Sequence, residues 1–235
     1  MWRMNKSSPI ILACDTEEIS SVIQFIEQTS QYVGVYKLGL EFFLAQGAQG
    51  VSEIQNQFPG VRIFLDLKLH DIPNTVSKAA KTIEELAPEF LTVHAAGGAA
   101  MISGAAAALP KTLITAVTVL TSLDEDELER MGLPPQPLDL AVSLAKNAVI
   151  NGARAIVCSP LEVESIRSAV GPETVLITPG VRPSNADSTN SDDQKRIATP
   201  KAAISAGANY VVIGRPITQA DNPTLAASAI FSSLQ

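Results

Sequence analysis

Short apolar runs alternate with amphipathic stretches about eight times along the 235 residues of this chain. The apolar runs have the length of buried strands, and the stretches between them have the spacing of helices that cover a sheet. Such alternation predicts an α/β protein with a parallel sheet. The expected strands are 10–15, 34–39, 61–69, 90–96, 112–120, 153–158, 174–178 and 210–214, and the expected helices are 16–30, 41–57, 75–86, 97–109, 138–151, 161–170, 200–206 and 222–234.

About eight strand–helix cycles without a linker-like break predict one closed domain, a (β/α)₈ barrel of the TIM type over residues 1–235. A doubly wound open sheet is the main alternative. No G-x-G-x-x-G turn follows the first expected strand, which argues against a dinucleotide-binding form of that alternative. Residues 121–137 form a longer insertion, in which the segment DEDELER predicts a short acidic helix.

The third expected strand leads into the most unusual stretch of the chain, FLDLKLHDIPNT at 64–75. A buried strand does not carry an Asp and a Lys unless they are paired or have a chemical role. Asp66 and Lys68 are two residues apart, so in an extended strand they share one face, about 6.6 Å apart along it. Asp71 follows just past the strand end, and Asn74 or Thr75 is the expected N-cap of the next helix. A purely structural ion pair remains the alternative to a catalytic one.

Further polar residues stand at the ends of other expected strands, and closure of the barrel would bring them to one mouth. Asp15 has an alternative role as a helix cap, and Lys37 could be a lysine whose stem lies along apolar surface while its ammonium reaches water. His94 is expected to be a hydrogen-bonded structural residue. The strand-end set is Asp15, Lys37, Asp66, Lys68, His94, Thr121, Thr178 and Arg215.

The stretch 179–199 is polar and rich in Gly, Pro, Ser, Asn and Asp. A loop of about twenty residues inside a compact domain is typical of a lid or a binding loop. Barrels of this type often bind phosphate in the loops after their seventh and eighth strands. Candidates there are Arg182 and Gln194, together with Gly214 and Arg215, where a glycine lets a backbone N–H approach a phosphate that the arginine grips.

The composition argues against several classes of partner and binding site. The net charge is −7 and no basic run exists, which argues against a nucleic-acid partner. Two cysteines and two histidines do not make a disulfide framework or a histidine-based metal cluster. The first residues lack the apolar stretch of a signal peptide, and no run has the length of a membrane span. We expect a cytoplasmic protein without a membrane partner.

The sequence DLKLHDIPNT at 66–75 closely resembles the signature of the orotidine 5′-phosphate decarboxylase family, in its bacterial form. The similarity extends along most of the chain, and the combined pattern is highly specific. Two departures, Leu69 where an aromatic residue is common and Cys14 where leucine is frequent, do not touch the chemistry. The other matching motifs are LACD ending at Asp15, YKLGLE around Lys37, VTVLTS through Thr121, TPGVRP, DDQKR around Gln194 and VIGRPIT around Arg215.

The resemblance implies a homodimeric (β/α)₈ barrel with active sites at the subunit interface. It implies decarboxylation of orotidine 5′-phosphate to UMP and CO₂, the last step of pyrimidine nucleotide synthesis, without cofactor or metal. By analogy the charged array is Lys37, Asp66, Lys68 and Asp71, with Asp71 from the other subunit. Asp15 and Lys37 would contact the ribose, Ile72 and Thr75 of the partner would complete the pocket, Thr121 would hold the pyrimidine, and Arg182, Gln194, Gly214 and Arg215 would hold the phosphate.

Two alternatives stay open at this point. Sugar-phosphate decarboxylases of the same superfamily share the D-x-K-x-x-D core but use a metal ion and an enediolate. The 72–75 segment and the Thr121 motif favour the nucleotide enzyme. A catalytically silent phosphate-binding barrel is the second alternative, and the intact Asp66, Lys68 and Asp71 series argues against it.

Overall fold

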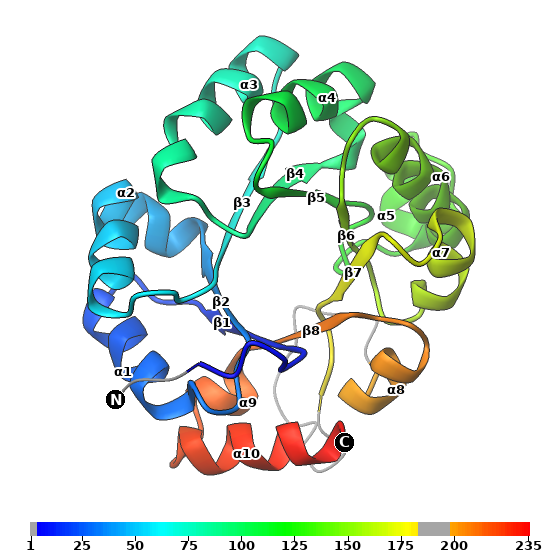
Figure 1. Ribbon diagram of the computed structural model, residues 1–235. Helices are drawn as coiled ribbons and strands as arrows, with labels where there is room; N and C mark the ends of the chain where they lie inside the picture. Colours follow the sequence, from blue (N-terminus) through cyan, green and yellow to red (C-terminus); the bar gives the residue numbers. More distant parts are fainter. Residues whose placement is uncertain (1–3, 183–197) are drawn as a thin grey trace.

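Eight parallel strands close into a barrel in the computed structural model, which describes residues 4–182 and 198–235 (Figure 1). Each strand pairs with the next, and the last pairs with the first. This confirms the predicted (β/α)₈ barrel and excludes the open sheet. The strands are β1 Ile10–Cys14, β2 Val35–Gly39, β3 Ile63–Leu69, β4 Phe90–His94, β5 Leu113–Val117, β6 Ala155–Val157, β7 Val175–Thr178 and β8 Tyr210–Ile213.

Helices form a ring outside the barrel, and the predicted ones lie within a few residues of their expected places (Figure 1). The short α9, directly after β8, was not predicted. None of the helices in the two described ranges is long and apolar enough to cross a membrane. The helices are α1 Ile19–Thr29, α2 Leu40–Gln57, α3 Pro73–Thr82, α4 Ala99–Ala108, α5 Glu125–Arg130, α6 Pro137–Ile150, α7 Val163–Val170, α8 Pro200–Ser205, α9 Arg215–Thr218 and α10 Pro223–Ser233, with 3₁₀ turns η1 Glu84–Leu86 and η2 Ala95–Gly97.

The start of α3 corrects one prediction. The helix begins at Pro73 with Ile72 at the N-cap position, whereas Asn74 or Thr75 was expected there. Proline suits the first helical position because its fixed φ is already helical and its missing N–H would have no partner there. The α3 helix also ends at Thr82, and the last residues of the predicted helix form η1 instead.

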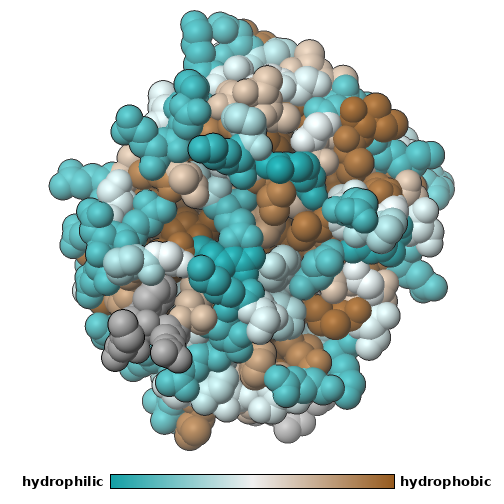
Figure 2. Space-filling model, in the orientation of Figure 1, coloured by the Kyte–Doolittle hydropathy of each residue, from teal (hydrophilic) through white to brown (hydrophobic). Residues whose placement is uncertain are grey.

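The N-terminal end of the barrel is closed by a polar cluster. The Arg62 guanidinium pairs with both carboxylate oxygens of Glu89 and donates to the Tyr210 hydroxyl at 2.8 Å. It also donates to the Lys6 carbonyl at 3.0 Å. Figure 2 shows this face, with hydrophilic residues across its middle.

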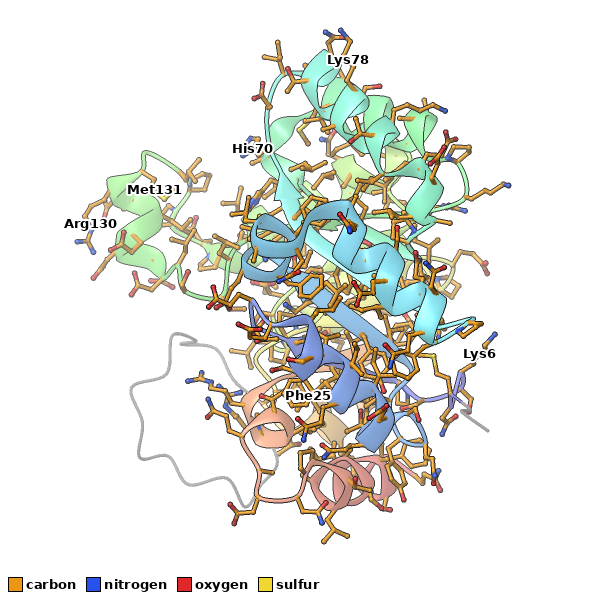
Figure 3. All side chains as sticks on the ribbon, turned by 90° about the vertical axis from the view of Figure 1, so that its left-hand side faces the viewer. Lys6, Phe25, His70, Lys78, Arg130 and Met131 are labelled. Atoms are coloured by element: carbon orange, nitrogen blue, oxygen red, sulfur yellow. The ribbon has the colours of Figure 1, made fainter. Side chains whose placement is uncertain are left out.

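The loops that follow the strands gather at the opposite end. Seen from the side, α5 with Arg130 and Met131 lies at one end of the molecule and Lys6 lies at the other (Figure 3). His70, just after β3, lies towards the same end as α5 (Figure 3). We call this end the mouth.

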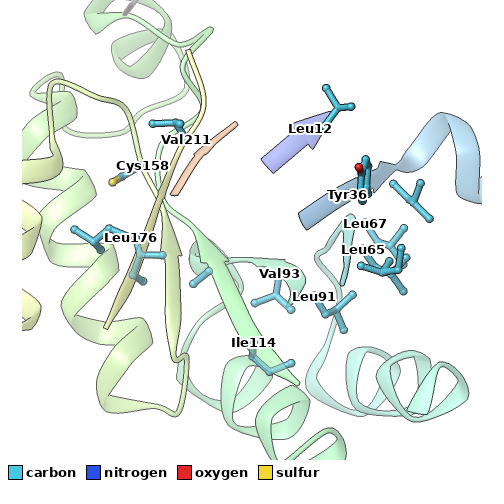
Figure 4. Packing of buried hydrophobic residues seen from close by; sticks show 14 of the residues in the cluster. Leu12, Tyr36, Leu65, Leu67, Leu91, Val93, Ile114, Cys158, Leu176 and Val211 are labelled. Carbon is cyan, nitrogen blue, oxygen red and sulfur yellow. The ribbon is translucent and has the colours of Figure 1, made fainter. Parts of the chain in front are cut away.

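Two layers of core follow from the alternation of side chains along each strand. One set of strand residues packs against the helices, among them Leu12, Leu65, Leu91 and Leu176 (Figure 4). The other set fills the barrel interior, and consists of Ile11, Val35, Phe64, Phe90, Ala155 and Ile177, with the rings of Phe64 and Phe90 5.5 Å apart. The next interior positions towards the mouth on β2, β3 and β4 are Lys37, Asp66 and Thr92.

Candidate active site

A cavity of about 580 Å³ occupies the mouth of the barrel. Its floor includes the interior residue Phe64, and its wall comes from residues in or after seven of the strands. A cavity of this size suits a ligand of nucleotide size. Predicted site residues that line it are Asp15, Lys37, Asp66, Lys68, Thr121, Arg182, Gly214 and Arg215.

Four of these side chains form a line of alternating charge. The Lys37 ammonium lies 3.0 Å from Asp15 Oδ1 and 3.5 Å from Asp66 Oδ2. The Lys68 ammonium lies 2.9 Å from the other oxygen of Asp66. Asp66 therefore bridges two ammonium groups, and Lys68 is the last cation of the line.

The strand register explains how this line is held. Lys37 pairs with Phe64, and Gly39 pairs with Asp66, so both charged residues stand on the interior face above the apolar core. Gly39 lies beside the ion pair, where an added Cβ would make ordinary contacts, 3.5 Å from Lys37 Nζ and 3.7 Å from Asp15 Oδ1. The lysine is 9% exposed and paired, so it does not reach past the barrel into water.

The backbone at Lys68 departs from the expected extended strand. Its φ is +46°, and the register between β3 and β4 shifts between Leu65 and Leu69. The strand therefore lacks the regular geometry expected at Lys68, although Asp66 and Lys68 do border the same cavity, as their predicted shared face requires. The irregularity still directs the Lys68 ammonium back to Asp66.

Thr92 is a residue of the site that sequence reasoning missed. Its hydroxyl accepts a hydrogen bond from the Lys68 backbone N–H at 2.8 Å and donates one to Asp66 Oδ1 at 3.0 Å. The signal was present in the strand alternation, because Thr92 follows Phe90 by two residues and so faces the barrel interior. Thr218 and Gln219, in and after the unpredicted α9, also line the cavity.

Both central charges are retained at neutral pH. Burial favours the neutral form of Asp66, but Lys37, Lys68 and the hydrogen bonds from Lys68 and Thr92 outweigh it and lower the pKa of the carboxyl. Burial likewise disfavours the charged form of Lys37, yet Asp66 and Asp15 outweigh it and raise the pKa of that ammonium. Each group thus keeps its partner in the charged state.

Two histidines stand beside the array. The rings of His70 and His94 lie 5.3 Å apart with a tilt of 37°. Burial, and then the nearby His70 and Lys68, lower the pKa of His94, and Asp66 only partly opposes this. His94 is therefore neutral in the folded protein at neutral pH.

This lowered pKa predicts a sensitivity of the fold to acid. Below about pH 6.5 the unfolded chain binds a proton at His94 that the folded chain resists. The contribution of the neutral His94 ring to the free energy of unfolding is fully present above about pH 6.5. It is lost as the pH falls towards the pKa of His94 in the folded protein. We expect His94→Gln to reduce the loss of unfolding free energy between about pH 7.5 and about pH 5 in urea titrations. An unchanged pH dependence would contradict the assignment.

Three predicted site residues do not line the cavity. Asp71, Ile72 and Thr75 are exposed, and Asp71 Oδ1 accepts a hydrogen bond from the Ile72 N–H at 2.6 Å. Thr178, expected at the mouth, is buried and does not line the cavity either. Gln194 lies outside the described residues.

The predicted lid at 179–199 falls mostly on 183–197, outside the described residues. The two segments that flank that range are hydrogen-bonded to each other. The Arg182 N–H donates to the Ala198 carbonyl at 2.9 Å, and the Ala198 N–H donates to the Gly180 carbonyl at 3.2 Å. Arg182 and Arg215 both line the cavity, and they follow the neighbouring strands β7 and β8. Among the described residues no group of three or more His, Cys, Asp or Glu side chains could hold a metal ion.

Comparison with known proteins matches residues 8–230 to the family described as "Orotidine 5'-phosphate decarboxylase / HUMPS family". The orotidine 5'-phosphate decarboxylase of Thermobifida fusca is 48% identical over 97% of each chain, and that of Sphingopyxis alaskensis is 50% identical over 97% of this chain and all of the relative. The crystal structure of the Lactobacillus acidophilus enzyme superposes with a TM-score of 0.83 at 35% identity, covering 97% of this chain and 99% of the other. The chain therefore belongs to the orotidine 5'-phosphate decarboxylase / HUMPS family.

Proposed function

We propose that this chain is a carboxy-lyase that converts orotidine 5′-phosphate to UMP and CO₂, the final step of UMP synthesis, without a cofactor. One observation carries the proposal. The Lys68 ammonium lies 2.9 Å from Asp66, at the end of a line of alternating charge that borders a cavity of about 580 Å³. Relatives that are 42–50% identical over nearly the whole chain are named for this activity.

The reaction breaks the bond between C6 of the pyrimidine and its carboxylate. The electron pair of that bond stays on C6 while CO₂ leaves, and C6 then takes a proton. In the proposal the Lys68 ammonium faces C6, stabilises the developing negative charge and delivers the proton. Asp66 holds that ammonium in place, and Asp66 also lies close to the departing carboxylate, whose charge it repels.

Stabilisation of the charge at C6 by the Lys68 ammonium supplies only part of the required lowering of the barrier. One charge pair at 4 Å is worth about 4 kcal/mol at an effective dielectric of 20. Enzymes lower barriers by roughly 8–23 kcal/mol, so one ammonium does not suffice. Binding of the remote phosphate supplies the remainder in this proposal, because its contacts orient the substrate against the array. Arg182, Gln194, Gly214 and Arg215 are the proposed phosphate ligands, and closure of the 179–199 loop over the phosphate stays a prediction.

The remaining proposed contacts are those to the ribose and to the pyrimidine. Asp15 and Lys37 bind the ribose hydroxyls, and Thr121 binds the pyrimidine. The ion pair between Asp15 and Lys37 at 3.0 Å puts an acceptor and a donor side by side, which suits a diol.

We further propose a homodimer in which each cavity is completed by the partner subunit. Within one chain Asp71, Ile72 and Thr75 are exposed and stand outside the cavity, which supports the proposal that a second copy brings them to a site. Ile72 is a large apolar side chain that is 65% exposed in the single chain. The partner subunit's Asp71 would then extend the line of charge beyond Lys68. Each chain carries a net charge of −7, and we propose that the dimer works in the cytoplasm without nucleic-acid or membrane partners.

The decisive experiment adds orotidine 5′-phosphate to the purified protein in the presence of a chelator and follows the pyrimidine absorbance. We expect conversion to UMP at the same rate with and without the chelator. Loss of activity with chelator would favour the metal-dependent sugar-phosphate decarboxylases. Binding of UMP without any turnover of orotidine 5′-phosphate would favour the silent phosphate-binding barrel.

A further inference from the structure

Thr92 is the interior residue of β4 at the level of the charged array. Its side chain is fully buried, and it stands two residues above Phe90 of the apolar interior. It is not among the residues that line the cavity. A hydroxyl in such a place has no access to substrate, so any role it has is exercised through its neighbours.

One hydroxyl makes two directed hydrogen bonds here. Thr92 Oγ1 accepts from the Lys68 backbone N–H at 2.8 Å and donates its own proton to Asp66 Oδ1 at 3.0 Å. The same oxygen of Asp66 accepts from the Lys68 ammonium at 2.9 Å. A closed ring of hydrogen bonds therefore links the Thr92 hydroxyl, the Asp66 carboxylate, and the backbone and ammonium of Lys68. A serine or threonine hydroxyl can donate and accept at once, whereas valine, of similar shape, can do neither.

The ring coincides with the backbone irregularity of β3. Lys68 has a φ of +46°, in the left-handed region that is sterically unfavourable for a residue with a Cβ. Such a conformation persists only where the surroundings determine it from several sides. The regular register with β4 is interrupted between Leu65 and Leu69, and within this interruption the hydroxyl of Thr92 accepts the Lys68 N–H.

We propose that Thr92 is a positioning residue that holds the backbone of Lys68 in its left-handed conformation and fixes Asp66, so that the ammonium is aimed into the cavity. This inference rests on the proposed function, because it concerns how that site is held. It predicts a defect in turnover more than in binding, since Thr92 does not line the cavity. A catalytic group displaced by about 1 Å loses on the order of 100-fold in rate.

The test compares three single variants. Thr92→Val removes both hydrogen bonds and keeps the shape, and Thr92→Ser restores the hydroxyl. Thr115→Val is the matched control, because Thr115 is the register partner of Thr92 on β5, is equally buried, and donates only to the Leu113 carbonyl at 2.9 Å. Each variant is assayed for kcat and KM with orotidine 5′-phosphate, for UMP affinity and for thermal unfolding.

We expect Thr92→Val to lower kcat by about 100-fold while KM and UMP affinity change by about threefold or less. Thr92→Ser should recover most of this loss, and Thr115→Val should keep the wild-type kcat. A Thr92→Val enzyme with wild-type kcat would overturn the proposal. Equal losses in Thr92→Val and Thr115→Val would overturn it too, because they would show a general effect of removing a buried hydroxyl. If Thr92→Val does not fold, Thr92→Cys, with its weak donor and acceptor, should lower kcat in the same direction, and an unchanged kcat would overturn the proposal.

A crystal structure of Thr92→Val separates this inference from the proposed function. We expect the Lys68 backbone to leave the left-handed region and its ammonium to move away from the 2.9 Å contact with Asp66. An unchanged array would overturn the inference whatever the substrate is. Absence of orotidine 5′-phosphate turnover in the wild-type protein would instead contradict the proposed function and leave the structural result to decide the role of Thr92.

Discussion

Replacing Lys68 with alanine is expected to lower kcat for orotidine 5′-phosphate by about 10⁵-fold or more, since it removes both a proton donor and a pre-aimed charge. Proton transfer by a positioned group contributes about 10²–10⁴-fold, and one stabilising contact to a developing charge contributes about 10²–10³-fold. Lys68 has both roles in the proposed mechanism, and Lys37, the neighbouring cation, is already held by Asp15 and Asp66.

The same variant should bind UMP nearly as well as the wild type. Arg182 and Arg215 at the other side of the cavity are untouched. Asp66 is not left as an unpaired buried charge, because Lys37 remains at 3.5 Å and Thr92 at 3.0 Å, so the fold should also survive. The measurements are single-turnover decarboxylation and calorimetric titration with UMP. Lys78→Ala, an exposed lysine on α3, is the control and should be fully active. Appreciable turnover by Lys68→Ala would remove the proton-donor role.

Much of the barrel was readable from the sequence because its signal is repetitive. Each apolar run that precedes a helical stretch is a strand in the structure. Asp66 was a candidate site residue because it is a charge inside such a run. The mouth then followed from topology alone, since parallel strands in a closed barrel end together. This is why Asp15, Lys37 and Asp66, in or directly after three different strands, could be expected from the sequence to meet.

The parts that sequence reasoning missed depend on departures from regular geometry. A strand period of two places Lys68 on the same face as Asp66, but it does not predict the positive φ or the register shift that the structure shows. The contact of Thr92 with the Lys68 N–H depends on that irregularity, so the sequence did not predict it. The N-cap of α3 was misplaced for a different reason, because side-chain capping preferences favoured Asn74 or Thr75 whereas the proline at 73 takes the first helical position.

Mixing two inactive variants, Lys68→Ala and Asp71→Ala, is expected to restore activity from almost none to about a quarter of the wild-type value. If the partner subunit's Asp71 completes each site, a mixed dimer has one site with both defects and one site with neither. Random exchange makes half of the dimers mixed, and half of their sites are intact, which gives the quarter. Activity is measured after the subunits have been allowed to exchange, and exchange is checked with a size-tagged variant.

A second mixture distinguishes sharing across the interface from other kinds of recovery. Lys37 and Lys68 contact the same Asp66 within one chain. A mixed dimer of Lys37→Ala and Lys68→Ala therefore carries one defect in each site and should stay inactive. Recovery in both mixtures would point to an effect of mixing unrelated to the site. No recovery with Asp71→Ala, once exchange is demonstrated, would mean that each site is built from one chain. Asp71 is exposed and outside the cavity in the single chain, so that outcome would require the loop after β3 to move its carboxylate into the cavity without a partner.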